Sequence, residues 1–380
     1  MSKIFMTGLT GLVGSSFLTA LLKDCPDTQF VCLVRGGKNR TAEERAREAV
    51  RSQCDFDGES SRFVEVMKHV TVVDGDVVTM DSAAVASNPL VAGTEEIFHC
   101  AADVNLGKDP TGKTFRINYN GTVHMLELAK LLKVKAFHYV STAYVAGRKK
   151  GIALEAEAEN SGFNNPYEES KFKAEKLVRE SGFPFTIYRP AIITGRRSDG
   201  RIRRPLAFYR IIEFLAKMKS HRCKKMNIDP VSKMDLKIHF KVIPSERVYF
   251  VPIDYVQYAI AKCYQLPVAN QTYHVTGDSP VSTMMIDKAV CKTLNLAQVD
   301  ISGGENRDGD DDKLMERFLG DLFPYFSANI EFSQTNIRKA LGDAALNWKY
   351  AEHELEVMMR NYFADFYPDV EWLQNVIGNR

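Results

Sequence analysis

The residues best suited to chemistry are a tyrosine and a lysine in the segment YEESK, where Tyr167 and Lys171 stand four positions apart. In a helix, side chains at this spacing lie on one face. A lysine ammonium beside a phenol lowers the pKa of the phenol, which then donates or accepts a proton near neutral pH. At the end of the fifth expected strand the segment YVST supplies hydroxyl groups, and we expect Thr142, or Ser141, to orient a substrate oxygen against the phenol. The pattern predicts a proton-transfer site.

Asn118 is a further candidate, on the helix expected after the fourth strand. Its amide either positions a proton-relay water near Lys171 or is an ordinary polar group of that helix. The sequence leaves both interpretations open.

A glycine-rich segment, TGLTGLVG, follows an apolar strand and opens an apolar helix. Glycines at this spacing permit a tight turn, close approach of a pyrophosphate and close packing of the helix on the sheet. The helix N-terminus offers N–H groups and the positive end of its dipole to the phosphates. The segment therefore predicts a dinucleotide site. Its expected residues are Thr7, Gly8, Thr10, Gly11, Leu12, Val13 and Gly14.

The end of the second strand indicates which dinucleotide binds. An acidic residue there would accept from the ribose hydroxyls of NAD. The segment CLVRGGK has no acid, and Arg35 is suited to pair with a 2′-phosphate through its planar guanidinium. Arg45 or Lys38 is expected to give a second positive contact. The sequence predicts NADP(H) as the cofactor.

Two more strand ends are expected to line the cofactor site. In VDGDV the carboxylate of Asp76, followed by Val77, is placed to accept from the adenine amino group. After the fourth strand Cys100, Ala101 and Ala102 are small enough for the cofactor to pass close to the backbone.

The elements that position these residues alternate between strands and helices. Expected strands are Lys3–Thr7, Phe30–Val34, Val70–Val73, Glu96–Cys100, Ala136–Ser141 and Phe185–Tyr188. Expected helices are Leu12–Leu22, Ala42–Gln53, Phe115–Leu132 and Tyr167–Glu180. This order is typical of an α/β fold, a Rossmann-type doubly wound parallel sheet with helices on both faces. Ligands of such sheets bind at the carboxyl ends of the strands.

The pattern changes after Pro190 and favours a smaller, mostly helical C-terminal substrate lobe. We expect residues 1–195 to form the NADP(H)-binding domain, with strands returning from about 248–280, and residues 196–380 to form the substrate-binding lobe. Later helices are expected at Leu206–Met218, Tyr255–Tyr264, Thr283–Leu294, Asp312–Leu319, Gln334–Ala340 and His353–Phe363, and strands at Val248–Pro252 and Gln271–Thr276. Ser302–Asp312 is expected to be a polar, acidic loop.

Composition narrows the class of protein. The 380 residues carry a formal net charge of +2, which gives no indication of nucleic-acid binding. The seven cysteines include no Cys-x-x-Cys pair, and the histidines show no metal-ligand spacing, so we expect no metal site and a reducing compartment. No signal-peptide pattern and no membrane-spanning apolar stretch is evident, which predicts the cytoplasm. The oligomeric state is left open.

Taken together, these motifs resemble the extended short-chain dehydrogenase/reductase family, and within it the thioester reductase branch. That branch includes fatty acyl-CoA reductases and the reductase domains of carboxylic acid reductases and nonribosomal peptide synthetases. The resemblance covers roughly residues 1–280 and rests on the segments TGLTGLVG, CLVRGG, AEERAREAV, HCAADVNL, NYNGTVHMLELAK, YVSTAYVAG, YEESKFKAEKLV, YRPAIITG, VPIDYVQYAI and TYHVTGDSP.

The resemblance implies a role for several residues. Thr142, Tyr167 and Lys171 would be the catalytic trio, and Arg35 and Arg45 would hold the 2′-phosphate. Pro190 and Ala191 would pass the nicotinamide carboxamide. The implied reaction is the NADPH-dependent reduction of an acyl thioester to an aldehyde, and possible continuation to an alcohol is left open.

We expect the chain to carry no adenylation or carrier domain, so the thioester would arrive as a CoA ester or on a separate acyl carrier protein. Between Arg196 and Lys225 basic residues strongly outnumber the acids Asp199 and Glu213. This segment either holds coenzyme A phosphates or an acidic carrier helix, or is a solvated basic face.

Other functions remain open at this stage. The first is a carbonyl, alcohol or hydroxysteroid-type dehydrogenase, or a nucleotide-sugar epimerase or dehydratase, on the same fold. A more remote alternative is a non-catalytic NADP(H)-sensing protein.

Overall fold

The computed structural model describes residues 2–378 except 237, 239, 241–244, 298 and 300–309, and only the backbone of Asp311. Most of the acidic loop expected at Ser302–Asp312 therefore lies outside the described residues. Its last part instead begins a helix, because α11 spans Asp310–Leu319.

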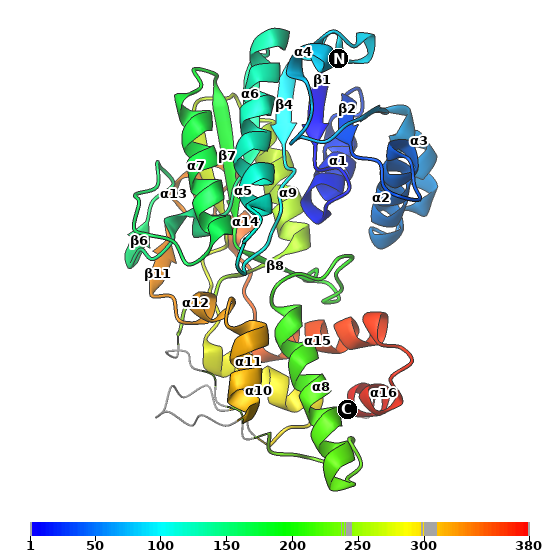
Figure 1. Ribbon diagram of the computed structural model, residues 1–380, viewed down its shortest axis with the longest axis vertical. Helices are drawn as coiled ribbons and strands as arrows, with labels where there is room; N and C mark the ends of the chain where they lie inside the picture. Colours follow the sequence, from blue (N-terminus) through cyan, green and yellow to red (C-terminus); the bar gives the residue numbers. More distant parts are fainter. Residues whose placement is uncertain are drawn as a thin grey trace.

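Within the described residues, seven parallel strands form one sheet in the order β10-β7-β5-β4-β1-β2-β3 (Figure 1). The strands are β1 (Lys3–Thr7), β2 (Gln29–Val34), β3 (Val70–Asp74), β4 (Glu96–His99), β5 (Ala136–Val140), β7 (Phe185–Pro190) and β10 (Gln271–Val275). The chain order reverses between β1 and β4, which is the switch point at which such sheets bind ligands. The predicted fold class, a Rossmann-type doubly wound sheet with a helical C-terminal lobe, is confirmed.

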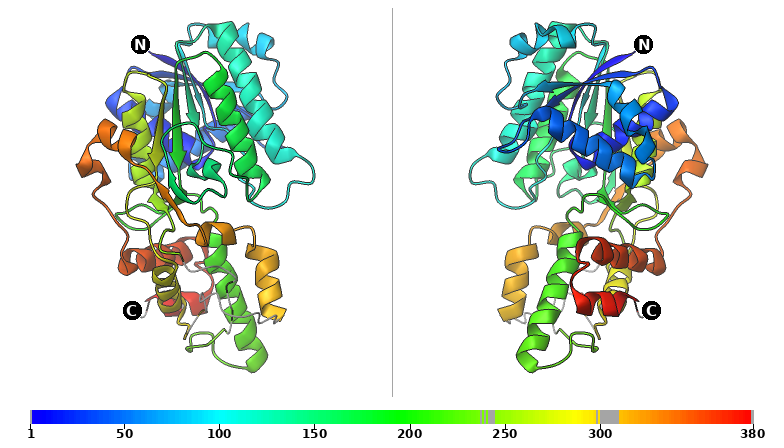
Figure 2. Two further views of the ribbon diagram at one scale, coloured as in Figure 1. Left: turned by 90° about the vertical axis from the view of Figure 1, so that its left-hand side faces the viewer. Right: turned by 90° about the vertical axis from the view of Figure 1, so that its right-hand side faces the viewer.

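Helices cover both faces of this sheet (Figure 2). One face packs α1 (Leu12–Asp24), α2 (Ala42–Phe56) and α9 (Ile253–Tyr264). The other packs α4 (Ser82–Ala86), α6 (Gly121–Leu132) and α7 (Pro166–Glu180). Because both faces are covered, the inner strands are largely buried; for example, all five residues of β5 are buried.

The C-terminal lobe lies beside the carboxyl ends of the strands (Figure 1). Its helices are α8 (Tyr209–Met226), α10 (Thr283–Leu294), α11, α12 (Phe323–Phe326), α15 (Glu352–Phe366) and α16 (Glu371–Gly378). Some later elements return to the sheet, since α13 (Thr335–Leu341) packs on β10 and α9 and is followed by α14 (Asp343–Leu346). The division at residue 195 into cofactor and substrate units stays a prediction.

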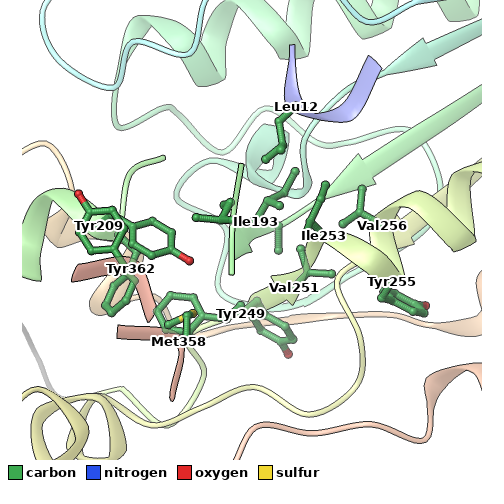
Figure 3. Packing of buried hydrophobic residues seen from close by; sticks show 14 of the residues in the cluster. Leu12, Ile193, Tyr209, Tyr249, Val251, Ile253, Tyr255, Val256, Met358 and Tyr362 are labelled. Atoms are coloured by element: carbon green, nitrogen blue, oxygen red, sulfur yellow. The ribbon is translucent and has the colours of Figure 1, made fainter. Parts of the chain in front are cut away.

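Two short parallel sheets join the sheet domain to later parts of the chain. In one, β8 (Ile192–Thr194) pairs with β9 (Phe250–Pro252); in the other, β6 (Gly151–Ala153) pairs with β11 (Ile330–Phe332). Figure 3 shows Leu12 of α1 and Ile193 of β8 in one buried cluster with Tyr209 and Tyr362 of the lobe. One continuous hydrophobic core therefore fixes the lobe against the glycine-rich helix.

Most expected elements are present, with shifted ends. The helix expected at Phe115–Leu132 is divided into α5 (Lys113–Phe115), a π-helical turn η3 (Arg116–Asn120) and α6. The helix expected at Leu206–Met218 begins three residues later and runs on to Met226 as α8. Short elements that were not expected are α3 (Phe63–Lys68) and the 3₁₀ turns η1 (Ser60–Arg62), η2 (Pro89–Val91) and η4 (Ala143–Ala146).

Candidate active site

A cavity of about 400 Å³ opens at the carboxyl ends of the sheet and extends to the lobe. It brings together the glycine-rich segment, the predicted proton-transfer residues and the end of β7. The predicted residues that line it are Gly11, Leu12, Val13, Cys100, Ala102, Thr142, Tyr167, Lys171, Pro190 and Ala191. Parts of the chain far apart in sequence thus form one site.

Two glycines of the glycine-rich segment are required by close backbone approach. Gly8 has φ of +82°, and a Cβ atom built there would lie 2.6 Å from the Cys100 carbonyl carbon. A Cβ atom on Gly14 would lie 2.2 Å from the Gly8 carbonyl oxygen. Gly11 caps α1 with extended backbone and has no side chain to bond the first N–H groups of the helix. The helix start therefore faces the cavity with its N–H groups available to an anion.

Thr7 supports the site from within the protein. Its side chain is fully buried, and its hydroxyl accepts hydrogen bonds from the backbone N–H groups of Cys100 (3.2 Å) and Ala101 (3.1 Å). It also bonds His99 Nδ1 at 2.7 Å. Thr7 thus joins the ends of β1 and β4, and only its backbone is left for a cofactor. Of the segment's other predicted residues, Thr10 lies on the same loop, where its carbonyl oxygen accepts from Arg204.

Tyr167 and Thr142 face each other in the cavity, because Tyr167 lies in the first turn of α7 and Thr142 directly after β5. Burial raises the pKa of the Tyr167 phenol, and a hydrogen bond with Thr142 lowers it only in part. The expectation that Lys171 depresses this pKa is not met, since desolvation outweighs other effects. The phenol is therefore protonated at neutral pH and is suited to act as an acid. Thr142 also caps η4 and lies 3.4 Å from the Pro190 carbonyl oxygen.

Lys171 is almost fully buried one turn further along α7. Its Nζ donates a 2.7 Å hydrogen bond to the Val140 carbonyl oxygen and lies 4.1 Å from the centroid of the Tyr139 ring. Burial lowers the pKa of Lys171 to about 7, against smaller opposing effects of Cys100 and Glu175. Because burial disfavours the charged form of Lys171, the charge of this side chain changes with pH near neutrality.

Asn118 lies in the π-helical turn η3 and is fully engaged in protein contacts. Its Oδ1 accepts from the Asp103 N–H at 2.8 Å, and its Nδ2 donates to the Asp103 carbonyl at 3.1 Å and to Ser170 Oγ at 2.9 Å. Ser170 Oγ donates in turn to the Tyr167 carbonyl oxygen. These bonds fix the loop after β4 against α7; a role in holding a relay water stays a prediction.

Arg35 and Arg45 lie together at the end of β2. Arg45 donates to the Arg35 carbonyl oxygen, and the Arg35 side chain is 61% exposed. Arg35 Nη1 pairs with Asp76 Oδ2 at 2.9 Å, while Asp76 Oδ1 accepts from the Val78 N–H. Asp76, predicted to accept from adenine, thus binds Arg35 in this structure. Val77 is buried against Gly121, the first residue of α6.

The remaining predicted cofactor residues lie at strand ends. Cys100 and Ala102 line the cavity after β4, and burial raises the pKa of the Cys100 thiol to about 12, so this thiol is not a nucleophile. Pro190 ends β7, and the Ala191 N–H bonds the Val275 carbonyl oxygen at 3.4 Å.

Several cavity residues were not among the predicted catalytic and cofactor residues. Tyr144, from η4, packs edge-to-face on Tyr325 with ring centroids 4.6 Å apart. The far wall of the cavity is apolar and comes largely from the connection before α8 and from the α12 region. Its residues are Leu206, Ala207, Phe208, Leu322, Tyr325 and Phe326. The aromatic run FPYF predicts a buried segment, but the sequence does not indicate that this segment forms a wall of the cavity.

The basic segment Arg196–Lys225 does not form one charged face. Three of its arginines form ion pairs with acids elsewhere, as Arg197 does with Asp254 and Arg201 with Asp365. Arg210 pairs with Asp321 at 2.7 Å. Lys219 is fully buried and donates to the Leu294 carbonyl oxygen at 2.7 Å. Much of this charge is therefore structural.

Among the helices that the structure describes, none is both long enough and apolar enough to cross a membrane.

Comparison with known proteins gives a family and a fold. The family model described as male sterility protein, an NAD-binding family, matches residues 6–260. The aldehyde reductase lnbA of Aspergillus flavus is 25% identical over 305 residues, which are 74% of this chain and 28% of that protein. The chain spans about a quarter of the length of the curated relatives that it matches first.

Two solved structures share the fold over almost the whole chain. The terminal R domain of the myxalamid PKS-NRPS pathway superposes with a TM-score of 0.72 at 23% identity, covering 96% of this chain and 91% of that one. A thiolation-reductase di-domain of an archaeal non-ribosomal peptide synthetase gives a TM-score of 0.70 at 20% identity, covering 97% and 91%.

Proposed function

The chain belongs to the male sterility protein family of NAD-binding oxidoreductases, and we propose that it uses NADPH to reduce an acyl thioester, carried by coenzyme A or an acyl carrier protein, to the aldehyde. The observation that carries this proposal is the cavity itself. It is lined at one end by Gly11, Leu12 and Val13, in the middle by Tyr167 and Lys171, and at the other end by apolar side chains of the lobe.

The thioester substrate is supported by the relatives. The solved structures that share the fold of this chain include a terminal R domain and a thiolation-reductase di-domain, in which the reductase is joined to a thiolation domain of a peptide synthetase. The apolar wall around Phe208, Leu322 and Phe326 supports an acyl group rather than a sugar.

The residues around the glycine-rich segment fit a dinucleotide. The start of α1 faces the cavity without a side-chain cap, which suits a diphosphate. The exposed guanidinium of Arg35 supports a 2′-phosphate, and the pairing of Arg35 with the Asp76 carboxylate indicates that this guanidinium already binds an anion. No acid takes the place of Arg35 after β2, so NADPH is preferred to NADH.

Residues of the chain itself would carry out the proton transfer that accompanies reduction. A bound nicotinamide cofactor would supply the hydride that the carbonyl carbon of the thioester accepts. Tyr167 Oη donates its proton to the carbonyl oxygen as that oxygen gains negative charge, and Thr142 Oγ1 holds the same oxygen by a hydrogen bond. The resulting hemithioacetal loses its carbon–sulfur bond and gives an aldehyde and a free thiol. Lys171 stabilises the phenolate that remains on Tyr167 and holds the nicotinamide ribose.

A panel of candidate substrates tests the proposal. Consumption of NADPH is followed by absorbance with acyl-CoA esters, acyl carrier thioesters, free aldehydes, ketones and sugar nucleotides, and products are identified by mass spectrometry. We expect oxidation with thioesters, accompanied by an aldehyde or its alcohol and one equivalent of thiol. Oxidation with aldehydes or ketones alone would instead make the protein a carbonyl reductase. Conversion of a sugar nucleotide without net NADPH consumption would make it an epimerase.

A further inference from the structure

Two neighbouring arginines of the chain between β8 and α8 lie over the glycine-rich segment. Arg203 Nη2 donates to the Gly11 carbonyl oxygen at 3.0 Å, and Arg204 Nη1 lies 3.4 Å from the Thr10 carbonyl oxygen. Sequence analysis assigned neither residue to the cofactor site. The carbonyl groups they contact belong to adjacent residues of the loop that precedes α1, so both guanidinium groups lie beside the start of that helix.

Arg203 is fixed in position by several contacts. Besides Gly11 it donates to Ser15 Oγ at 2.6 Å and, through Nε, to Gln53 Oε1 at 3.2 Å. Burial, followed by the charge of Arg204, lowers the pKa of the Arg203 guanidinium to about 10, so it remains charged at neutral pH. Its hydrogen-bond partners are neutral oxygen atoms, and the Asp57 carboxylate offsets the effect of Arg204 on its charge only in part.

Arg204 is exposed and its side chain lines the cavity. Within the described residues its guanidinium makes one hydrogen bond, the long contact to Thr10, and no ion pair with a carboxylate. Other arginines of the same segment do have such partners, as Arg201 has Asp365 and Arg210 has Asp321. Arg203 and Arg204, which contact the glycine-rich segment, differ from these two arginines in forming no ion pair among the described residues.

Like charges in close proximity repel, and a helix N-terminus adds a further positive potential. Two guanidinium groups beside the start of α1 add to this positive potential, which favours an anion next to the exposed Arg204. We propose that Arg204 binds the diphosphate of the bound dinucleotide from the side opposite α1, with Arg203 as a positioning residue that holds a fixed charge behind it. This inference rests on the proposed cofactor site and adds to it a group from the chain that leads into the lobe.

A second phosphate-bearing molecule in the proposed reaction is the thioester, because coenzyme A and carrier proteins present phosphate esters. The position of Arg204 over Thr10, on the loop that contacts the diphosphate in folds of this kind, favours the cofactor. The two sources are separable by experiment, since cofactor binding is measured without any thioester.

The test compares Arg204→Gln with two other variants in direct binding titrations. Arg201→Gln is the matched control, since Arg201 lies in the same connection and pairs with Asp365. Arg35→Gln is the comparator for the 2′-phosphate. Each variant is titrated by calorimetry with NADPH and with adenosine 2′-monophosphate, which keeps the 2′-phosphate and lacks the diphosphate. The thermal midpoint of each variant without ligand reports its folding.

We expect Arg204→Gln to weaken NADPH binding by about 10-fold, the size of one charge-assisted contact, and to leave the affinity for adenosine 2′-monophosphate unchanged. Arg35→Gln should weaken both ligands, and Arg201→Gln neither. Arg204→Lys should restore part of the NADPH affinity, because it keeps the charge. Added salt should reduce the difference between the wild-type protein and Arg204→Gln.

Equal NADPH affinity of Arg204→Gln and the wild-type protein would overturn the inference. So would a variant in which only the KM for a CoA ester rises, with the KM for a pantetheine thioester without phosphates unchanged, because Arg204 would then bind the substrate. The binding result is independent of turnover. If no thioester is reduced but Arg204→Gln still loses NADPH affinity, the proposed function fails and this inference stands.

Discussion

Asn165 Nδ2 donates a 2.8 Å hydrogen bond to Tyr325 Oη, joining the start of α7 to α12 of the lobe. Asn165 is also the N-cap of α7, where its Oδ1 accepts from the Glu168 N–H at 3.0 Å. Tyr325 Oη further bonds the buried Glu168 carboxylate. The helix that carries Tyr167 and Lys171 is therefore capped by a residue that also holds the lobe wall of the cavity.

Replacing Tyr325 by Phe tests this connection. The ring is retained against Tyr144, while Asn165 and Glu168 lose a buried partner, so we expect the free energy of unfolding to fall by about 1–3 kcal/mol. We also expect the KM for the thioester to rise, since the lobe wall loses its attachment, and NADPH affinity to be unchanged. Tyr258→Phe, at an exposed position on α9, is the control. A KM equal to that of the wild-type protein would show that the bond is only structural.

Tyr167→Phe should abolish reduction while the fold and the cofactor site are kept. The phenol is the proposed proton donor, and loss of such a group costs about 10²–10⁴-fold in kcat. Tyr144→Phe is the matched control because Tyr144 lines the same cavity and is not part of the proposed chemistry. Turnover and NADPH affinity are measured for both variants. Undiminished kcat in Tyr167→Phe would remove the proposed acid.

The buried ammonium of Lys171 predicts a pH dependence. Burial lowers its pKa to about 7, so the group is charged below this pH and loses its proton as the pH rises. The role of Lys171 in holding the Tyr167 phenolate requires the charge, and we expect kcat/KM to fall on the alkaline side of about pH 7. Lys171→Arg, charged throughout, should give lower activity without this alkaline limb. The same limb in both proteins would exclude Lys171 as its origin.

The pH dependence of stability due to Lys171 has the opposite sign to that of activity. The unfolded chain keeps its lysine proton up to a pKa of about 10.5, whereas the folded chain loses it above about 7. Between these values the unfolded state binds more protons, so the contribution of this group to stability increases with pH. A decline of activity above pH 7 would therefore not be caused by unfolding through Lys171.

The sheet and the shared helix face of Tyr167 and Lys171 were predictable from the sequence because their signals are local. Strands such as β1 and β5 are short apolar runs, and the four-residue spacing of Tyr167 and Lys171 alone places them on one helix face. The π-helical turn at Asn118 was not predictable, since the apolar spacing of Phe115–Leu132 suits a regular helix. It depends on the bonds of Asn118 to Asp103 and Ser170, which lie in other elements.

The features that the sequence did not predict depend on contacts between segments that are far apart in the chain. The three-residue strands β6 and β8 are too short for any alternation, and each exists through a partner more than fifty residues away. Tyr325 of the lobe bonds Asn165, 160 residues earlier in the chain, and the exposed Arg204 contacts Thr10, 194 residues earlier. The pKa of Tyr167 was predicted with the wrong direction because spacing indicates a neighbouring charge but gives no measure of burial.

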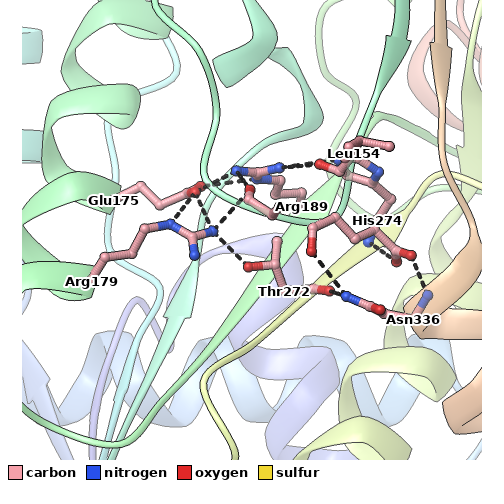
Figure 4. A network of polar contacts seen from close by, with 9 residues as sticks. Leu154, Glu175, Arg179, Arg189, Thr272, His274 and Asn336 are labelled. Atoms are coloured by element: carbon pink, nitrogen blue, oxygen red, sulfur yellow. Dashed lines mark hydrogen bonds and ion pairs between the residues drawn. The ribbon is translucent and has the colours of Figure 1, made fainter.

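The buried ion pair of Glu175 and Arg189 should contribute strongly to folding (Figure 4). Arg189 Nε donates to Glu175 Oε2 at 3.1 Å, and Arg179 bonds the same carboxylate. Burial would raise the pKa of Glu175, but the two arginines lower it to about 2. Glu175→Gln leaves Arg189 buried without a charged partner, and we expect a loss of about 3–5 kcal/mol in the free energy of unfolding.

Glu169 provides the matched control on the same helix. Its pair with Lys173 is exposed on both sides, so Glu169→Gln should change the free energy of unfolding by less than about 1 kcal/mol. Both variants are compared by urea denaturation at neutral pH. Similar small losses for Glu169→Gln and Glu175→Gln would contradict the importance of the buried network.

Cofactor preference should depend on Arg35. Its guanidinium is exposed and already binds the Asp76 carboxylate, so a 2′-phosphate would replace a weaker exposed pair. Arg35→Gln should lower kcat/KM for NADPH by about 10–100-fold, as expected for loss of charged hydrogen bonds. The value for NADH should be unchanged or higher, because NADH has no 2′-phosphate. Arg40→Gln is the control, since Arg40 pairs with Glu48 at the surface. An equal loss for both cofactors would mean that Arg35 supports the strand end and does not select NADPH.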